Sequence, residues 1–253
     1  MIKNNLKSIV VALMIAGWPL SVPAAERPSA AALVDQADQF RQPFDGASLK
    51  VRLISYRNGQ QHSQANYHVW ANGNEKSLAA MLDPKVKGQK VLMLPEGMWL
   101  HMPSSRRAIR ITPMQRLMGQ ASYGDITQLR MGGLYAAVYD AEKPEGVIEG
   151  ESVWNLKLSS KHANTTYTKI DLSVAKDSGR PVTAAFFLQS GKLLKKAVFG
   201  GLEMSAGAQF ITTITFHDAL RANRQTTMTV SELKRMNFRQ SDFSVRALAR
   251  WRP

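Results

Sequence analysis

The sequence of 253 residues contains no cysteine. It therefore cannot form disulfides or bind a metal through thiolates. After residue 24 the sequence has no hydrophobic run long enough to cross a membrane as a helix, which needs about 20 apolar residues. Runs such as Thr183 to Leu188 have the length of a strand. Stability must come from a packed core, and the remaining 253 − 24 = 229 residues are enough for one large β domain.

Motifs of catalysis are lacking as well. The five histidines show no short metal-binding spacing, and no serine lies in a nucleophile elbow. Gly200, Gly201 and Gly207 lack the lysine and hydroxyl that complete a phosphate-binding loop. Asp125 and Asp140 could pair as acid and base, but solvated turns or structural salt bridges explain them as well. We therefore predict no enzyme, no metal and no cofactor.

Carboxylates are scarce relative to cations. The chain has 33 Lys and Arg against 19 Asp and Glu, a formal net charge of +14. Such an excess attracts anionic surfaces, such as lipid headgroups, lipopolysaccharide or acidic proteins. Nucleic acid fits the charge, but the chain has no nucleic-acid recognition motif or basic helix and begins with an export signal, so we predict no nucleic-acid partner.

The N-terminus has the pattern of a secretory signal peptide. Lys3 and Lys7 precede an apolar stretch at Ile9 to Ile15, and small residues before position 25 predict cleavage after Ala24. No cysteine follows to carry a lipid anchor. The exported chain, 25–253, then keeps a charge of 14 − 2 = +12.

Hydrophobic periodicity predicts a mainly β fold with a few helices. Leu33, Ala37 and Phe40 give Ala31 to Phe40 one apolar helical face. From Leu49 onward apolar residues alternate with polar ones between turn signals, which predicts an antiparallel meander, closed or partly closed. Lys90 to Leu94 and Met98 to Met102 flank a Pro-Glu-Gly turn and are predicted to form a hairpin. No linker or repeat is visible, so we predict one domain.

One predicted strand is apolar on both faces. In Val182 to Leu188, Phe186 lies on one face and Phe187 on the other. Such a strand needs a cover on each side, either helices of the same chain or a ligand. The sequence does not decide between these two kinds of cover.

The segment from Met98 to Gly124 combines cations with soft apolar side chains. It holds four arginines, five residues of the Met and Trp types, and no carboxylate before Asp125. This combination suits a ligand that is apolar at one end and anionic at the other. A strand and loop with solvated arginines fits the same residues.

Short motifs in and around this segment occur in a characteristic order. They are Leu82-Asp83-Pro84, Lys87-Gly88, Val91 to Met93, Met98 to Pro103, Arg106 to Ile111, Met118-Gly119, Tyr123 and Asp125-Ile126. With Trp154 to Leu158 and Gly191-Lys192 further on, the chain resembles the outer-membrane lipoprotein-sorting proteins, relatives of the periplasmic carrier LolA. It departs from them at Gln120-Ala121-Ser122, where the family usually has a Ser-Asp-Phe-like triplet.

The resemblance implies a fold and a function. The fold is an unclosed antiparallel β-barrel wrapped around short helices, here over 25–253, with an apolar cavity. The function is carriage of a lipid or lipoprotein acyl chain between envelope membranes, in the periplasm and with transient membrane contact. Members are often linked to transporters of the resistance-nodulation-division type, which makes such an inner-membrane exporter a candidate partner.

In that fold the segment around the predicted hairpin would supply the binding site. We predict a cavity wall made by apolar residues, namely Met93, Trp99, Leu100, Met102 and Met118. Headgroup or partner contacts are predicted for Arg106, Arg107 and Arg110. Since Trp99 and Leu100 alternate along a strand, one of the two must face away. The alternative function is a basic exported interaction subunit that binds an anionic envelope polymer or an acidic partner protein, without lipid cargo.

Overall fold

A computed structural model describes residues 27–73, 76–105 and 107–251. The predicted signal peptide, 1–24, and Arg106 lie outside these residues. Within them, none of the helices is long and apolar enough to cross a membrane.

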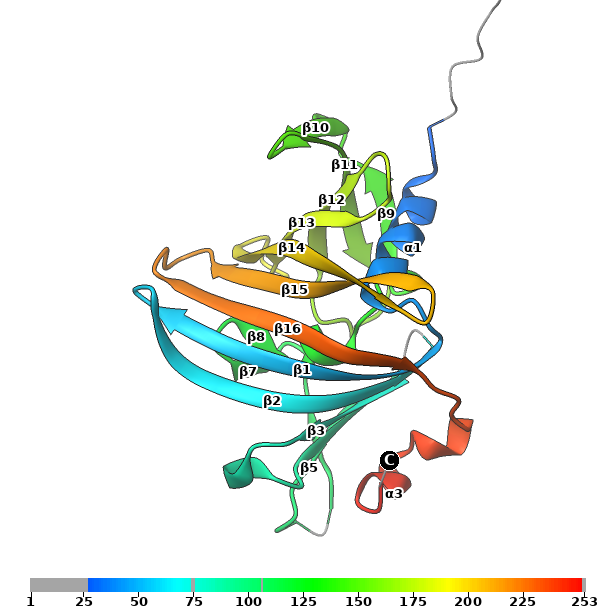
Figure 1. Ribbon diagram of the computed structural model, residues 1–253, viewed down its shortest axis with the longest axis vertical. Coiled ribbons are helices and arrows are strands. Elements are labelled where there is room, and N and C mark those ends of the chain that lie inside the picture. The colour runs from blue at the N-terminus through cyan, green and yellow to red at the C-terminus, as the bar shows by residue number, and fades with distance from the viewer. Residues whose placement is uncertain (1–26, 74–75, 106, 252–253) are drawn as a thin grey trace, which may run out of the picture.

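Fourteen strands form one curved antiparallel sheet, in the order β10-β11-β12-β13-β14-β15-β16-β1-β2-β3-β4-β5-β6, with β9 also paired to β11 (Figure 1). In the described ranges its two ends do not pair with each other, so the sheet is not closed. The predicted mainly β, unclosed antiparallel fold is therefore confirmed. Its strands are β1 Gly46–Arg57, β2 Gln60–Asn72, β3 Lys76–Met81, β4 Lys90–Leu94, β5 Gly97–His101, β6 Ile109–Ile111, β9 Tyr135–Tyr139, β10 Glu145–Ile148, β11 Glu151–Ser160, β12 Lys169–Ala175, β13 Pro181–Phe187, β14 Leu193–Ser205, β15 Ala208–Asp218 and β16 Arg224–Arg235.

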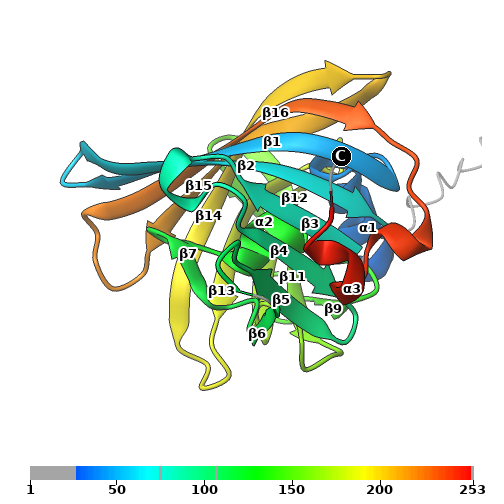
Figure 2. The same cartoon turned by 90° about the horizontal axis from the view of Figure 1, so that it is seen from below.

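In the part of the chain that the structure describes, three α-helices and a small hairpin accompany the sheet. Figure 2 shows α2 (Tyr123–Thr127) and the hairpin β7 (Arg116–Met118) and β8 (Ala121–Ser122) inside the curve of the strands. Helix α1 (Ala30–Arg41) packs against β15 and β9. Helix α3 (Val245–Leu248) lies near the C-terminus.

Alternation along the strands explains which face is buried. In β1, Leu49, Val51 and Leu53 are at most 1% exposed, whereas Lys50 and Arg52 between them are exposed. The predicted helix at 31–40 is confirmed as α1, whose Ser29 side chain accepts a hydrogen bond from the backbone of Ala32 at 3.1 Å as an N-cap. The predicted hairpin of β4 and β5 is confirmed too, with Leu92 opposite Trp99.

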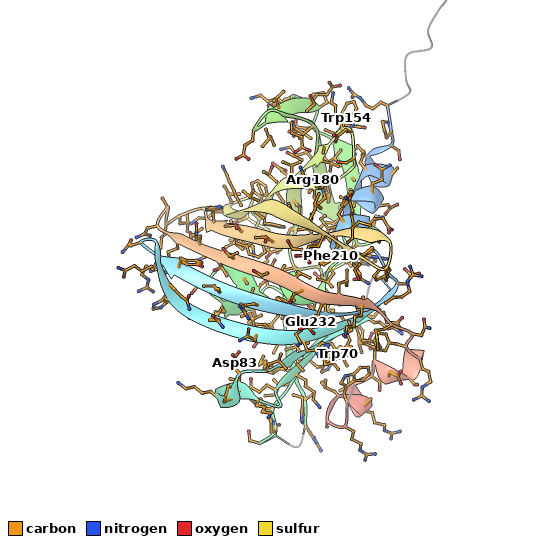
Figure 3. All side chains as sticks on the ribbon, in the orientation of Figure 1. Trp70, Asp83, Trp154, Arg180, Phe210 and Glu232 are labelled. Atoms are coloured by element: carbon orange, nitrogen blue, oxygen red, sulfur yellow. The ribbon has the colours of Figure 1, made fainter. Side chains whose placement is uncertain are left out.

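The outer face of β2 to β5 carries a second, separate apolar cluster. Trp70, labelled in Figure 3, and Leu92 pack there with Phe243 and Leu248 of the C-terminal segment. The Lys90 ammonium donates to the carbonyls of Leu248, Ala249 and Trp251 at 2.9 to 3.4 Å and ties that segment down. The C-terminal segment therefore covers part of the outer face of the sheet.

Candidate functional site

An apolar cavity lies between the concave face of the sheet and the elements inside it. Strands β12 to β15 supply its apolar floor through Ile170, Phe186, Phe199, Ile214 and Phe216. Opposite them lie α2, the end of α1 and the segment 128–135, which we call the cover segment. The cavity is about 30 Å³. This is enough for water but not for a larger molecule.

A second cavity of about 70 Å³ adjoins the first. Met93, Leu134 and His162 line it, and Gln128 lines both cavities. The Gln128 side chain accepts a hydrogen bond from the backbone of Thr166 at 2.7 Å and donates to the carbonyl of Asn164 at 3.0 Å. This glutamine therefore forms a polar partition inside an apolar interior.

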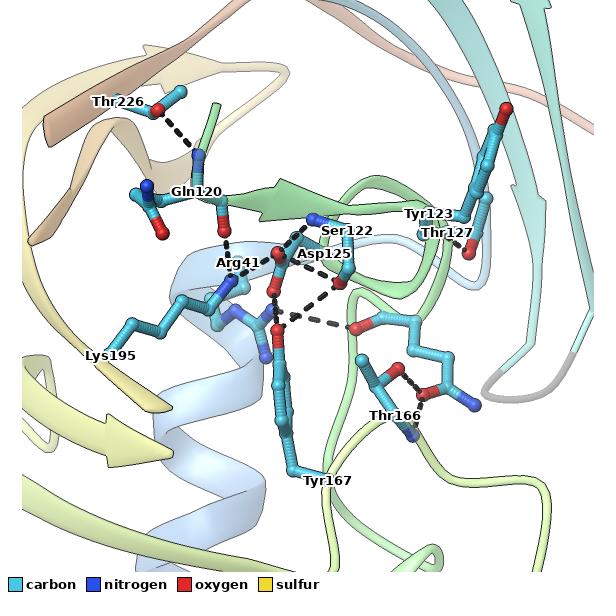
Figure 4. Close-up of polar contacts among 11 residues, drawn as sticks. Arg41, Gln120, Ser122, Tyr123, Asp125, Thr127, Thr166, Tyr167, Lys195 and Thr226 are labelled. Carbon is cyan, nitrogen blue, oxygen red and sulfur yellow. Dashed lines mark hydrogen bonds and ion pairs between the residues drawn. The ribbon is translucent and has the colours of Figure 1, made fainter. Parts of the chain in front are cut away.

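Figure 4 shows a buried ion pair whose carboxylate partner, Asp125, lines the cavity. Lys195 on β14 is 1% exposed and pairs with the Asp125 carboxylate on α2, which is 6% exposed. Asp125 also accepts hydrogen bonds from the Tyr167 hydroxyl at 2.7 Å and the Ser122 backbone at 2.7 Å. Burial raises the pKa of Tyr167 well above its usual value, so this hydroxyl stays a donor.

Aromatic rings surround the lysine. Its ammonium lies 4.0 Å from the ring centroid of Phe216 and 5.2 Å from that of Tyr167. It also donates to the Gln120 carbonyl at 2.9 Å. The ion pair thus fastens α2 and the β7–β8 turn to the sheet, while the neighbouring rings keep the cavity apolar.

Helix α1 is joined to the cover segment by buried polar contacts. Asp38 accepts hydrogen bonds from the backbone N–H groups of Met131 and Gly132 at 2.7 and 2.6 Å. Burial raises the pKa of Asp38 to about 6. Arg130 donates to the Gln42 carbonyl at 2.9 Å, and Arg41 donates to the Gln128 carbonyl at 3.5 Å.

The predicted wall residues are divided between the two faces of the sheet. Met93 belongs to the main core and lines the second cavity, and Leu100 and Met118 pack half-buried against the same core. Trp99 packs instead into the outer cluster, because strand alternation turns it away from Leu100. The prediction that Trp99 lies on the cavity wall is therefore wrong. Met102 is half-buried just after β5 and lines neither cavity.

Two of the predicted rim arginines, Arg107 and Arg110, do not line these cavities. Arg107 and Arg110 are exposed, and Arg110 donates to the Glu96 carbonyl at 2.5 Å. Its guanidinium lies 5.7 Å from the Trp99 ring centroid, on the outer face. The reason is the same alternation: Arg110 on β6 is opposite Trp99 and shares its face.

Several residues of the interior were not predicted from the sequence. The burial of Lys195 could have been predicted from alternation along its strand. Lys195 lies on the same face as the buried Ala197 and Phe199, whereas Lys196 is exposed. Asp125 pairs with a lysine, and Asp140 pairs with Lys157 at 3.2 Å, so both of the considered acids form salt bridges. Among the described residues no group of three His, Asp or Glu is placed to hold a metal ion.

The architecture defines a class: an unclosed antiparallel half-barrel around short helices, with an apolar interior. A LolA superfamily protein from Nitrosomonas europaea is 27% identical, with a TM-score of 0.80 over 86% of this chain and 98% of that chain. A putative outer membrane lipoprotein-sorting protein domain from Vibrio parahaemolyticus is 20% identical, with a TM-score of 0.69 over 85% of this chain and 97% of that chain. A DUF1329 family protein from Desulfovibrio piger is 20% identical, with a TM-score of 0.71 over 88% and 100%.

A family model described as "Uncharacterized protein" matches residues 73–250. No curated protein matches the chain. The match over most of the chain and the shared fold make this protein a member of the LolA-like family.

Proposed function

We propose that this protein is a non-enzymatic periplasmic carrier that holds a lipid or lipoprotein acyl chain against its apolar concave face. The observation that carries the proposal is the floor of the main cavity, where four neighbouring strands each present apolar side chains to the interior. Family membership supports it, as does the name of the Vibrio relative, a putative lipoprotein-sorting domain.

The energetics of acyl transfer explain why such a surface is needed. Each acyl methylene costs about 0.8 kcal/mol to expose to water, so a chain crossing an aqueous compartment needs an apolar shelter. A cavity of about 30 Å³ cannot hold it, so the interior must open. Residues 128–134 of the cover segment are the part to move, because hydrogen bonds of Asp38 and Arg130, worth about 1.5 to 3 kcal/mol each, join them to α1, whereas the floor belongs to a continuous sheet.

Transfer also requires a donor and an acceptor. The envelope membranes fill these roles in the proposal, and an inner-membrane exporter of the resistance-nodulation-division type is a candidate donor or acceptor. The surplus of cations favours transient contact with anionic membrane surfaces.

Filling the cavity tests the proposal. Ile170→Trp places a larger side chain on the floor and should abolish binding of a fluorescent fatty acid, because overpacking leaves no room for it. Ile109→Trp, at a position 49% exposed on β6, is the matched control and should bind like the wild type. Circular dichroism checks that both variants are folded.

Two results would contradict the carrier proposal. One is a wild-type protein that binds no apolar probe, and the other is equal binding by the wild type and Ile170→Trp. Binding of an anionic polymer or an acidic protein, with no apolar ligand bound, would favour the basic interaction subunit instead.

A further inference from the structure

A polar pocket lies where the hairpins β1–β2 and β15–β16 end side by side. Its volume is about 240 Å³. The two turns are joined by hydrogen bonds between Asn58 and Asn223, from backbone N–H to carbonyl at 2.9 Å and between the side chains at 2.5 Å. These contacts fix the strand ends that line the pocket.

Two arginines face each other across this joint. Arg57 on β1 is directly opposite Arg224 on β16, and both line the pocket. None of the described residues that line the pocket is acidic, so its lining is basic. An anion placed beside the two guanidinium groups would be attracted to both.

A β-bulge adds a histidine to the arginine pair. Ser55 pairs with Ser63 and Tyr56 pairs with Gln61, so His62 has no partner on β1 and its strand bends there. Bulges of this kind often redirect a side chain beside a binding site. His62 lines the same pocket, so three side chains with N–H donors converge on it.

The turn of the β7–β8 hairpin forms a wall of the pocket. Gln120 donates its backbone N–H to the Thr226 hydroxyl at 2.8 Å. At Gly119, where φ is +55°, an added Cβ would lie 2.2 Å from the Thr226 hydroxyl oxygen and 2.7 Å from the Cβ of Ser55. The backbone therefore approaches β16 and β1 closely, and glycine is the residue that permits it.

The same turn connects the pocket to the apolar interior. Gln120 lines the pocket, and its carbonyl accepts a hydrogen bond from Lys195 (Figure 4). Lys195 in turn packs on Phe216, which belongs to the cavity floor. One turn thus separates a basic pocket from the cavity proposed for the acyl chain.

We propose that this pocket binds a phosphate group through Arg57, Arg224 and His62. Guanidinium groups bind phosphate oxygens bidentately, and the uncharged donors of Gln120 and Gln225 add polar contacts nearby. The inference rests on the carrier function for its source: the phosphate is the headgroup of the lipid whose acyl chain enters the interior. It also replaces Arg107 and Arg110 as the headgroup site.

Calorimetry with three probes tests the proposal. Lysophosphatidic acid carries a phosphate and one acyl chain, monoacylglycerol carries the acyl chain alone, and inorganic phosphate has no acyl chain. Wild-type protein should bind lysophosphatidic acid at least about 10-fold more tightly than monoacylglycerol, as expected for hydrogen bonds to charged groups. Arg57→Gln should remove this preference and leave monoacylglycerol binding unchanged.

Arg52→Gln is the matched control, because Arg52 is an exposed arginine on the same strand and hydrogen-bonds to Asn66 outside the pocket. It should keep the preference. Thermal melts without ligand check that both variants are folded.

The outcomes separate the two proposals. Equal affinity for both lipids in every variant overturns the phosphate site and leaves the carrier standing. Arg57-dependent binding of inorganic phosphate without binding of either lipid supports the site, assigns it to free phosphate and contradicts the carrier. A preference for lysophosphatidic acid that Arg57→Gln does not change also overturns the site.

Discussion

Lys195 is a cation placed among aromatic rings in the interior of the sheet. Its charge is balanced by Asp125, which three further hydrogen bonds from Ser122 and Tyr167 hold in position. A buried pair of this kind contributes little net stability over an apolar pair, but removing one partner leaves an unpaired charge. The pair therefore specifies where α2 and the β7–β8 turn lie.

We predict that Lys195→Met lowers the free energy of unfolding by about 3 to 5 kcal/mol, because Asp125 loses its buried cation. The control is Lys196→Met at the exposed neighbouring position, where a change within about 0.5 kcal/mol is expected. Urea unfolding followed by tryptophan fluorescence measures both. Equal effects of the two substitutions would show that the ion pair has no structural role.

At the scale of elements, the contact between α1 and the cover segment depends on Asp38. Its Oδ2 accepts the hydrogen bonds of the cover segment, while its buried Oδ1 accepts none among the described residues and lies 3.9 Å from Arg41. Desolvation disfavours the ionised carboxyl and raises its pKa to about 6. The stability of the contact between α1 and the cover segment therefore depends on pH.

The sign of this linkage follows from the raised pKa. The folded protein holds the proton more tightly than the unfolded chain, whose carboxyl titrates near 3.8. Asp38 therefore stabilises the fold fully below about pH 4, and this contribution is lost as pH rises through about 6. We predict that the stability of the wild type relative to Asp38→Asn falls over this range, as measured by urea unfolding at successive pH values. A constant difference would contradict the assignment.

The elements also show how far the sequence could predict the structure. Alternation and turn signals were enough for α1 and the β4–β5 hairpin, because both depend on local periodicity. They did not indicate that β1 pairs with β16, since nothing local specifies contacts between segments so far apart.

The candidate site was harder to predict than the elements. Met93 lines a cavity, whereas Trp99 and Arg110 lie on the outer face together. Sequence alternation shows which residues share a face, but it does not show which face is concave. The C-terminal segment decides this, because it covers the face that carries Trp99.

At the scale of the whole molecule, one continuous sheet separates two apolar environments. The outer one is covered by the chain's own C-terminal segment, and the concave one holds the small cavities and the buried ion pair. The two-sided apolar strand β13 lies outside the outer cluster, and Phe187 on its outer face is half-buried. On the other face Phe186 packs against Tyr167 at 4.5 Å between ring centroids, so protein side chains cover that face.

The most direct test of the proposed carrier function is native mass spectrometry of the protein gently purified from the cells that produce it. We predict a mass above that of the bare chain, and extraction of the sample should yield an acyl-bearing species in near-stoichiometric amount. The same preparation of Ile170→Trp should show the bare mass. A wild-type protein at its bare mass, with extracts that match a blank, would contradict the account.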